Sequence, residues 1–271
     1  MLHTLVTITK DNWRWRKQIG RLAVFDLMKQ SRGAVLSWAW LLIKPAIFMF
    51  VFWFALEIGF KQGDPNAYPP YFLWLMSGVI PWFYMRDILS TGSDVLRRFP
   101  YLVNKLKFPL SAISTIFCLS NLVVHVALML IVFVIYLAFG VPLDLHLLQV
   151  PVIIICMFVF FTMFSILCSQ LSALSKDFAF LLKSLVTPLF WLSGILFNVN
   201  NLDASLTWIK TVLLFNPITF FAYAFRDALY ERVWVWENPV ALEVFAGIFV
   251  VTLLAMLIVY KRFHEEVHDA F

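Results

Sequence analysis

The sequence is poor in charged residues, and this scarcity excludes most soluble protein classes. Only 14% of its 271 residues are Asp, Glu, Lys or Arg, whereas 62% are hydrophobic. A soluble domain usually has about 25% charged and roughly 45–50% apolar residues, so this chain has too few charges to cover a surface that faces water. The composition indicates a protein of the lipid bilayer. It excludes a disordered chain, a disulfide scaffold and a basic nucleic-acid-binding protein.

Cysteine and glycine are also scarce. The three cysteines, Cys118, Cys156 and Cys168, lie inside long apolar runs, so they predict neither a disulfide framework nor a spaced set of metal ligands. The chain has nine glycines and no G-x-x-x-x-G-K-[ST] sequence, so it lacks a Walker loop for ATP, and it has no G-x-S-x-G nucleophile. We therefore expect no catalytic residue and no cofactor in this chain. Energy from ATP has to come through another polypeptide.

Six apolar runs are long enough to cross a hydrocarbon core of about 30 Å, which takes roughly 20 residues of helix. Tyr and Trp crowd their ends, as is typical of membrane interfaces. The sequence predicts one all-α membrane domain over 1–271, with an interfacial region at 1–33, a bundle at 34–260 and a tail at 261–271. The six predicted transmembrane helices are Leu36–Phe60, Tyr71–Ile88, Leu110–Phe139, Val150–Leu174, Phe178–Phe197 and Val240–Tyr260.

The basic residues predict the orientation of this domain. Most of the 21 Lys and Arg side chains precede the first span, follow the second or fourth, or follow the last. Basic residues accumulate on the cytoplasmic side of membrane proteins. We therefore expect both termini in the cytoplasm.

An amphipathic helix is predicted at Trp13–Met28, before the first span. Apolar side chains recur at spacings of three or four on one face, and basic side chains occupy the other. This pattern is typical of a helix that lies in the membrane interface. Arg16 and Asp26 interrupt its apolar face.

The predicted cytoplasmic stretch Ser90–Pro109 mixes aromatic residues with four basic ones, Arg97, Arg98, Lys105 and Lys107. One interpretation is a basic anchor for anionic lipid. The other is a short helix that docks into a cytosolic partner protein.

The predicted external stretch Asn198–Asn238 is long for a connection between spans. It contains two apolar segments, Leu206–Phe215 and Ile218–Tyr230, each too short to cross and separated by Asn216-Pro217. Broken helices occur at membrane depth when protein or a wet cavity surrounds them. We expect a re-entrant helical hairpin at the external mouth of a pathway.

A few polar residues lie inside the predicted spans. His125, the one histidine of the third run, is expected to be a hydrogen-bonded core residue. Glu57 and Lys44 lie near opposite ends of the first run, where both can reach water. Phe48 and Phe52 belong to an excess of aromatic rings in the same run, and such rings stack well on sugars.

One enzyme signature is present in the tail. His264-Glu265-Glu266-Val267-His268 matches H-E-x-x-H, in which two histidines hold zinc and the glutamate is a general base. Only three residues follow it, and nothing around it predicts a concave site. We interpret it as a chance match in a polar tail, so no metal site is expected.

The order of these features resembles the permease subunits of the ABC-2 type exporters. The likeness is strongest with the branch that moves polysaccharides and polyol-phosphate polymers, such as O-antigen, capsule and wall teichoic acid. It covers nearly the whole chain. The segments that carry it are Trp38–Pro45 (WAWLLIKP), Gly78–Phe83 (GVIPWF), Asn104–Leu110 (NKLKFPL), and Phe215–Thr219 (FNPIT) followed by Phe225-Arg226.

The resemblance implies roles for three sets of residues. Translocation is expected beside the first and fifth spans, where Pro188 would kink the fifth. The coupling helix that receives the motion of the ATPase would contain Arg97, Arg98, Phe99, Tyr101, Lys105 and Lys107. Aromatic candidates for the pathway are Phe48, Phe52, Trp53, Phe190 and Trp191. The external gate would contain Trp208, Asn216, Pro217, Phe220 and Arg226.

The resemblance also implies a location, the inner membrane of a bacterial cell, and partners. Six spans would be half a transporter, so a homodimer with two ATP-binding cassette subunits is expected, and those subunits would hold ATP and Mg. The cargo would be a lipid-linked glycan or polyol-phosphate polymer, and membrane lipid would surround the chain. Two alternatives stay open: an ABC-2 exporter of drugs or lipids, and a membrane zinc hydrolase that uses His264, Glu265 and His268.

Overall fold

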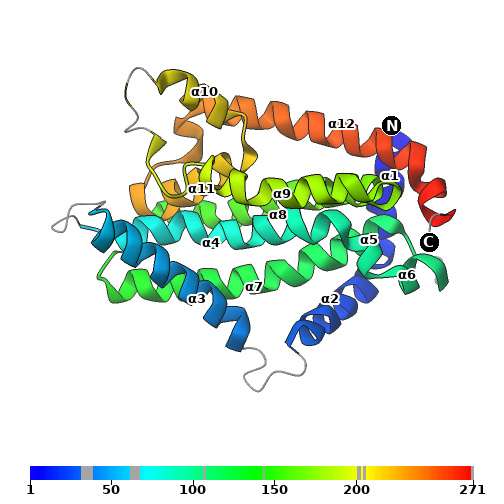
Figure 1. Cartoon of the computed structure of the whole chain (residues 1–271), viewed down its shortest axis with the longest axis horizontal. Coiled ribbons are helices and arrows are strands. Elements are labelled where there is room, and N and C mark those ends of the chain that lie inside the picture. The colour runs from blue at the N-terminus through cyan, green and yellow to red at the C-terminus, as the bar shows by residue number, and fades with distance from the viewer. Residues whose placement is uncertain are drawn as a thin grey trace.

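The computed structural model describes residues 1–31, 39–61, 68–105, 108–142, 144–199, 203 and 206–269, and all regular structure in these ranges is helical (Figure 1). The all-α prediction is therefore confirmed. The helices, with π and 3-10 segments labelled η, are α1 Leu2–Arg14, α2 Arg16–Ser31, α3 Trp40–Trp53, η2 Phe54–Gly59, α4 Tyr71–Ser90, η3 Gly92–Asp94, α5 Val95–Arg98, α6 Pro100–Lys105, α7 Leu110–Ala138, η4 Leu145–Leu148, α8 Gln149–Leu174, α9 Lys176–Trp191, α10 Thr207–Leu214, α11 Pro217–Arg226, η7 Asp227–Glu231, η8 Val235–Glu237 and α12 Pro239–Asp269.

Helix α4 forms the centre of the bundle. Fifteen of its twenty residues are buried, because α3, α7, α8, α9 and α11 all pack against it. Hydroxyl groups join the helices at close range: Tyr136 donates to the carbonyl of Leu73 at 2.8 Å, and Ser114 lies 3.2 Å from Ser169. Small residues such as the two serines let helices approach closely in a bilayer.

Each of the six predicted spans corresponds to a helix, but their lengths differ. Four described helices are long and apolar enough to cross a membrane: Trp40–Gly59, Leu110–Ala138, Leu145–Leu174 and Pro239–Phe263. The bent pair α10 and α11 with η7 would make a fifth if it counts as one span. Helices α4 and α9 do not meet this criterion, so the six-span topology stays a prediction.

Helix α9 is shorter than the predicted span Phe178–Phe197. It ends at Trp191, three residues after Pro188, and the chain then turns. Gly194 has a φ angle of +64°, which a residue with a Cβ rarely adopts. The turn carries Ile195 and Leu196 back into the core, where both are buried.

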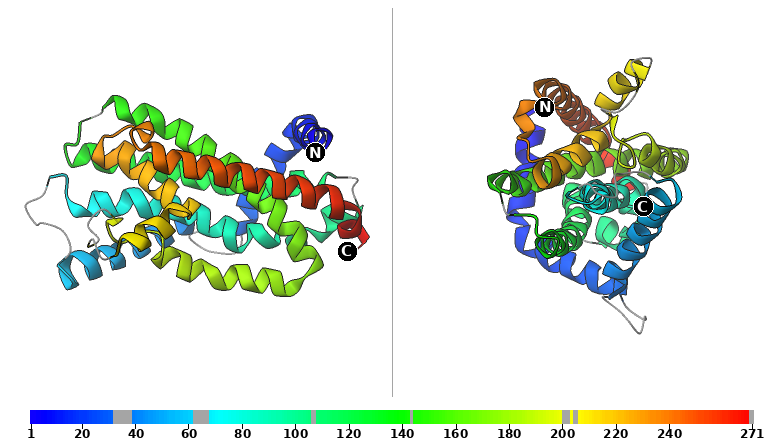
Figure 2. Two further views of the ribbon diagram at one scale, coloured as in Figure 1. Left: turned by 90° about the horizontal axis from the view of Figure 1, so that it is seen from above. Right: turned by 90° about the vertical axis from the view of Figure 1, so that its left-hand side faces the viewer.

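The N-terminal helices run across the bundle instead of along it (Figure 2). They lie at the end that also holds both termini, α5 and α6, whereas α10 and α11 lie at the other end (Figure 1). The predicted apolar face of α2 is confirmed, since Ile19, Ala23 and Leu27 are buried and α2 packs on α7. Its placement at a membrane interface stays a prediction.

Candidate functional site

The segment between α9 and α12 folds as a sharply bent pair of helices. The axes of the two arms form an angle of 91° at Asn216-Pro217. The side chain of Asn216 fixes this corner, because its Oδ1 accepts a hydrogen bond from the amide of Ile218 at 3.0 Å and its Nδ2 donates to the carbonyl of Leu192 at 3.1 Å. Pro217 is the first residue of α11, where a missing N–H leaves no helical hydrogen bond unmade.

Arg226 at the end of α11 is almost fully buried, with 1% of its surface exposed. Its guanidinium donates to the carbonyls of Gly194 at 3.2 Å and Ile195 at 2.9 Å. The same group lies over the ring of Trp74, 3.6 Å from its centre, and 4.9 Å from the ring centre of Tyr223. A buried cation is tolerated only with such partners, so one side chain joins α11, α4 and the turn after α9.

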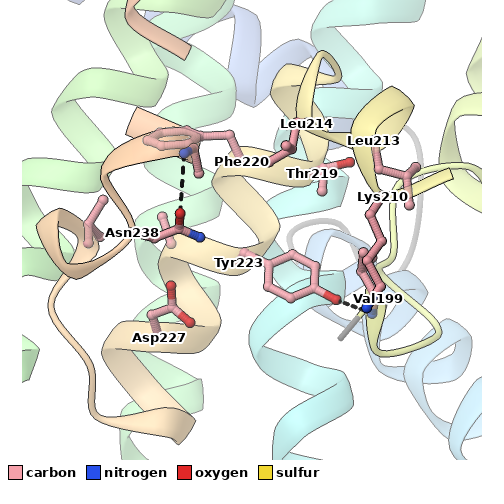
Figure 3. A pocket seen from close by; sticks show the side chains of 12 residues that line it. Val199, Lys210, Leu213, Leu214, Thr219, Phe220, Tyr223, Asp227 and Asn238 are labelled. Atoms are coloured by element: carbon pink, nitrogen blue, oxygen red, sulfur yellow. Dashed lines mark hydrogen bonds between the residues drawn. The ribbon is translucent and has the colours of Figure 1, made fainter. Parts of the chain in front are cut away.

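A cavity of about 140 Å³ lies between α10, α11 and the start of α12 (Figure 3). The hydroxyl of Tyr223 points away from the helix axis and accepts a hydrogen bond from the amide of Val199 at 2.7 Å. On another side, Asn238 Oδ1 accepts from the amide of Ala241 at 3.2 Å. The first bond holds the chain at Val199 close to α11, and the second caps the start of α12.

The two arms of the hairpin differ in burial. The second arm belongs to the core, where Phe221 and Phe225 are fully buried and Phe220 stacks on Phe245 of α12 with ring centres 4.0 Å apart. The first arm is peripheral: Trp208 is 65% exposed, on the outer surface of α10. The structure thus brings four of the predicted gate residues, Asn216, Pro217, Phe220 and Arg226, onto one anchored arm and leaves Trp208 outside it.

Four of the five aromatic pathway candidates gather between α3 and α9. Phe48 and Phe52 stack with ring centres 4.4 Å apart, and Phe190 lies 5.4 Å from Phe52. Trp191 extends the cluster to an exposed edge, with its ring centre 6.3 Å from that of Phe52. The fifth candidate, Trp53, faces away from this cluster: its ring packs on Phe72 of α4 and its indole N–H donates to Glu57.

The arginines of the predicted coupling region have partners within the chain. Arg97 donates three hydrogen bonds to the last carbonyls of α8, those of Ser172 at 3.0 and 2.7 Å and of Ala173 at 3.0 Å. Arg98 pairs with Asp26 of α2 at 3.1 Å. This pair also explains why an acid interrupts the apolar face of α2: Asp26 is 1% exposed and accepts a bond from Ser120 of α7 at 2.9 Å.

Of the remaining coupling candidates, Phe99 is buried and Tyr101 is 46% exposed on the short helix α6. Partial desolvation and the nearby Asp26 carboxylate raise the pKa of the Tyr101 hydroxyl above its usual range. The side chain of Lys105, and Lys107 as a whole, lie outside the described residues. Tyr101 is therefore the most exposed of the coupling candidates whose side chains the structure describes.

His125 is buried as expected, but the expectation of a hydrogen bond is wrong. Neither ring nitrogen has a partner in the part of the chain that the structure describes.

The side chains of the tail motif, His264, Glu265 and His268, lie outside the described residues. Elsewhere in the described ranges, no group of three or more His, Cys, Asp or Glu could hold a metal ion.

Sequence reasoning missed the partners of Arg226, namely Trp74, Tyr223 and the two backbone carbonyls. One signal was available, because an arginine inside an apolar segment such as Ile218–Tyr230 needs buried partners when the segment packs on protein. Trp74 and Tyr223 carry the polarisable rings that suit a cation. Nothing in their spacing identified them.

Comparison with known proteins adds an independent observation. The family model described as ABC-2 type transporter matches residues 17–230. The chain is 21% identical over 263 residues to the O-antigen export system permease protein RfbA of Myxococcus xanthus, covering 97% of this chain and 98% of that protein. It is 23% identical over 248 residues to the RfbA protein of Klebsiella pneumoniae, covering 89% and 91% respectively.

Proposed function

Because the chain belongs to the ABC-2 type transporter family, we propose that it is the permease subunit of an ATP-driven exporter of a lipid-linked polysaccharide. The observation that carries this proposal is the match to O-antigen export permeases along nearly the full length of both chains. A likeness over 97% of this chain includes the N-terminal helices, the cytoplasmic loop and the bent hairpin together. An O-antigen is the favoured cargo, and a capsular or teichoic-acid-like polymer is the wider class.

The proposed topology has six spans, formed by α3, α4, α7, α8, α9 and α12, in the bacterial inner membrane. An even number of crossings agrees with both termini at one end of the bundle (Figure 1). The basic residues favour the cytoplasm for that end. The hairpin of α10 and α11 would then be re-entrant at the external side.

In this proposal the α5–α6 region receives an ATP-binding cassette subunit, which holds ATP and Mg. The contacts of Arg97 with α8 and of Arg98 with α2 support this role mechanically. Both arginines belong to α5, so a push on α5 would reach α8 through Arg97 and α2 through Arg98. Two copies of this chain with two ATPase chains would complete the transporter.

The polymer would pass along the face formed by α3 and α9, where Phe48, Phe52, Phe190 and Trp191 gather. Aromatic faces suit the C–H faces of sugars. The hairpin, held by Arg226, would close the external side of this face. This arrangement favours a glycan over a small drug, because a drug needs one pocket and a polymer needs a continuous aromatic surface.

The proposal is tested by complementation and by purification. A strain that lacks its own O-antigen permease is supplied with this chain and its genomic ATPase partner, and surface polysaccharide is measured with an O-antigen antibody. We expect the ATPase to co-purify and surface polysaccharide to return. If the purified complex is stimulated by drugs or simple phospholipids, and not by glycan-lipid, the exporter belongs to the other branch.

A further inference from the structure

A second cavity, of about 460 Å³, lies among α2, α3, α4 and α7, away from the hairpin. Its wall differs from the rest of the bundle because it gathers charged side chains. Three cations line it, Lys44 of α3, Arg86 of α4 and Arg98 of α5, with one carboxylate, that of Asp87. A cavity in which a few charged groups converge is a candidate binding site, so the partners of these charges decide what it could hold.

Pairing within the chain accounts for two of the three cations. Arg86 forms an ion pair with Asp87 at 2.7 Å, and Arg98 pairs with Asp26 at 3.1 Å. Lys44 has no hydrogen bond or ion pair to a described residue, and it shares the Asp87 carboxylate electrostatically with the two arginines. When Asp26, which pairs with Arg98 from behind the wall, is included, three cations face two carboxylates, so the cavity has a net charge of +1.

The inner wall adds polar groups that have no partner. The hydroxyl of Tyr84 and both ring nitrogens of His125 are buried without a hydrogen bond in the described part of the chain, and both residues line this cavity. Buried polar groups are normally paired with protein or water. A polar ligand in the cavity, with small rotations of these rings, would supply the missing partners.

An apolar groove of about 540 Å³ adjoins this cavity along α3. Pro45 and Leu128 line both spaces, so the cavity and the groove lie side by side at these residues. The groove continues between Met49 and Phe72 on one side and Ile135 on the other, and its one carboxylate, Glu57, accepts the indole N–H of Trp53. A charged chamber beside an apolar groove suits an amphiphile, with room for a head group and for a chain.

We propose that the cavity and groove bind one membrane lipid whose head group is a phosphodiester, with the phosphate near Lys44 and an acyl chain along α3. The net charge of +1 around the cavity matches the single negative charge of a phosphodiester. The apolar groove selects a lipid over free phosphate, because a free anion would leave that groove unfilled. This inference concerns a lipid bound beside the pathway, and it does not depend on the identity of the exported polymer.

The test measures lipid binding to the full chain in detergent, by native mass spectrometry and by thermal unfolding. Phosphatidylglycerol is the probe, diacylglycerol supplies the same chains without phosphate, and sodium phosphate supplies the anion without chains. We expect one phosphatidylglycerol retained per chain and a raised unfolding temperature. Neither diacylglycerol nor sodium phosphate should reproduce this rise.

Charge variants of one exposed side chain separate binding from folding. Lys44→Arg should retain the lipid, Lys44→Gln should bind it roughly threefold to tenfold more weakly, and Lys44→Glu should lose it, because a charge-assisted contact is removed and then reversed. Lys10→Gln and Lys10→Glu make the same charge changes on the exposed surface of α1 and should bind as wild type does. Equal stabilisation by diacylglycerol or sodium phosphate, or equal binding by all Lys44 variants, would overturn the proposal.

Discussion

The guanidinium carbon of Arg226 lies 3.6 Å from the ring centre of Trp74, so a buried cation stacks on the central helix of the bundle. The same guanidinium donates to the carbonyls of Gly194 and Ile195. Three segments far apart in the sequence therefore meet at one side chain. Gly78, one helical turn after Trp74, leaves the space that the guanidinium occupies.

We expect Gly78→Ala to displace this guanidinium. A Cβ at position 78 would lie 2.5 Å from Nη2 of Arg226 and 3.6 Å from the carbonyl oxygen of Ile195. Because Arg226 is buried and tied to two carbonyls, it cannot swing away, and we expect a loss of about 1–3 kcal/mol of stability, as for other overpacked cores. Thermal unfolding in detergent measures the stability, and surface polysaccharide measures export.

The matched control for this change is Gly247→Ala in α12. A Cβ there meets nothing within 4 Å, so the only effect is better helix propensity, a gain of roughly 0.5–1 kcal/mol. If Gly78→Ala unfolds at or above the wild-type temperature, as the control should, the contact between Arg226 and α4 does not hold the hairpin.

The pair Asp26 and Arg98 gives a second prediction, about how the N-terminal helices are attached. Asp26→Ala leaves Arg98 and Ser120 without their carboxylate partner, and we expect a loss of about 1–3 kcal/mol. The loss should lie near the lower end, because the Arg98 side chain is 29% exposed and can turn to water. Unfolding of the single and double alanine variants measures the coupling between the two residues.

Glu243→Ala is the control for that cycle, since it removes an exposed carboxylate from α12 and should change stability by no more than about 0.5 kcal/mol. In the Arg98→Ala background, Asp26→Ala should have a smaller effect than in wild type. Strict additivity of the two single effects would show that the ion pair contributes nothing to the attachment of α2.

Much of the fold could be predicted from hydrophobic runs and periodicity. Apolar residues at spacings of three and four predict the amphipathic face of α2, and Ile19, Ala23 and Leu27 on that face are buried. The limits of α9 could not be predicted, because residues 192–197 are as apolar as the helix before them. What ends α9 is a tertiary turn at Gly194, which the core then covers.

The candidate site was predictable in its residue types and less so in its contacts. Basic residues in a loop suggest a surface for a partner, but Arg97 and Arg98 turn inward to α8 and α2. The direction in which each arginine turns depends on which carbonyls and carboxylates the fold brings near. The spacing of residues along the sequence does not reveal these partners. His125 shows the same limit, since its burial follows from its apolar neighbours and its missing hydrogen bond does not.

The third prediction separates a folding role from a docking role in the coupling region. Arg97→Ala removes three hydrogen bonds to α8 and should destabilise the permease by about 1–3 kcal/mol. Tyr101→Ala changes an exposed side chain and should leave stability within about 0.5 kcal/mol of wild type. Yet Tyr101→Ala should reduce the amount of ATPase that co-purifies. Wild-type recovery of the ATPase with this variant would exclude Tyr101 from the docking surface.

The last prediction concerns the aromatic face between α3 and α9. Trp191 is 55% exposed at the edge of the cluster, so Trp191→Ala should change stability little but remove a stacking surface for sugar rings. An aromatic contact contributes about 0.5–1.5 kcal/mol, so we expect export to fall roughly twofold to tenfold, measured as surface polysaccharide at equal permease levels. Leu192→Ala is the control, because the Leu192 side chain is exposed to a similar extent, at 62%, and has no aromatic ring. If both variants export at the wild-type rate, polymer does not pass along this edge of the cluster, and the pathway has to be sought on another face of the bundle.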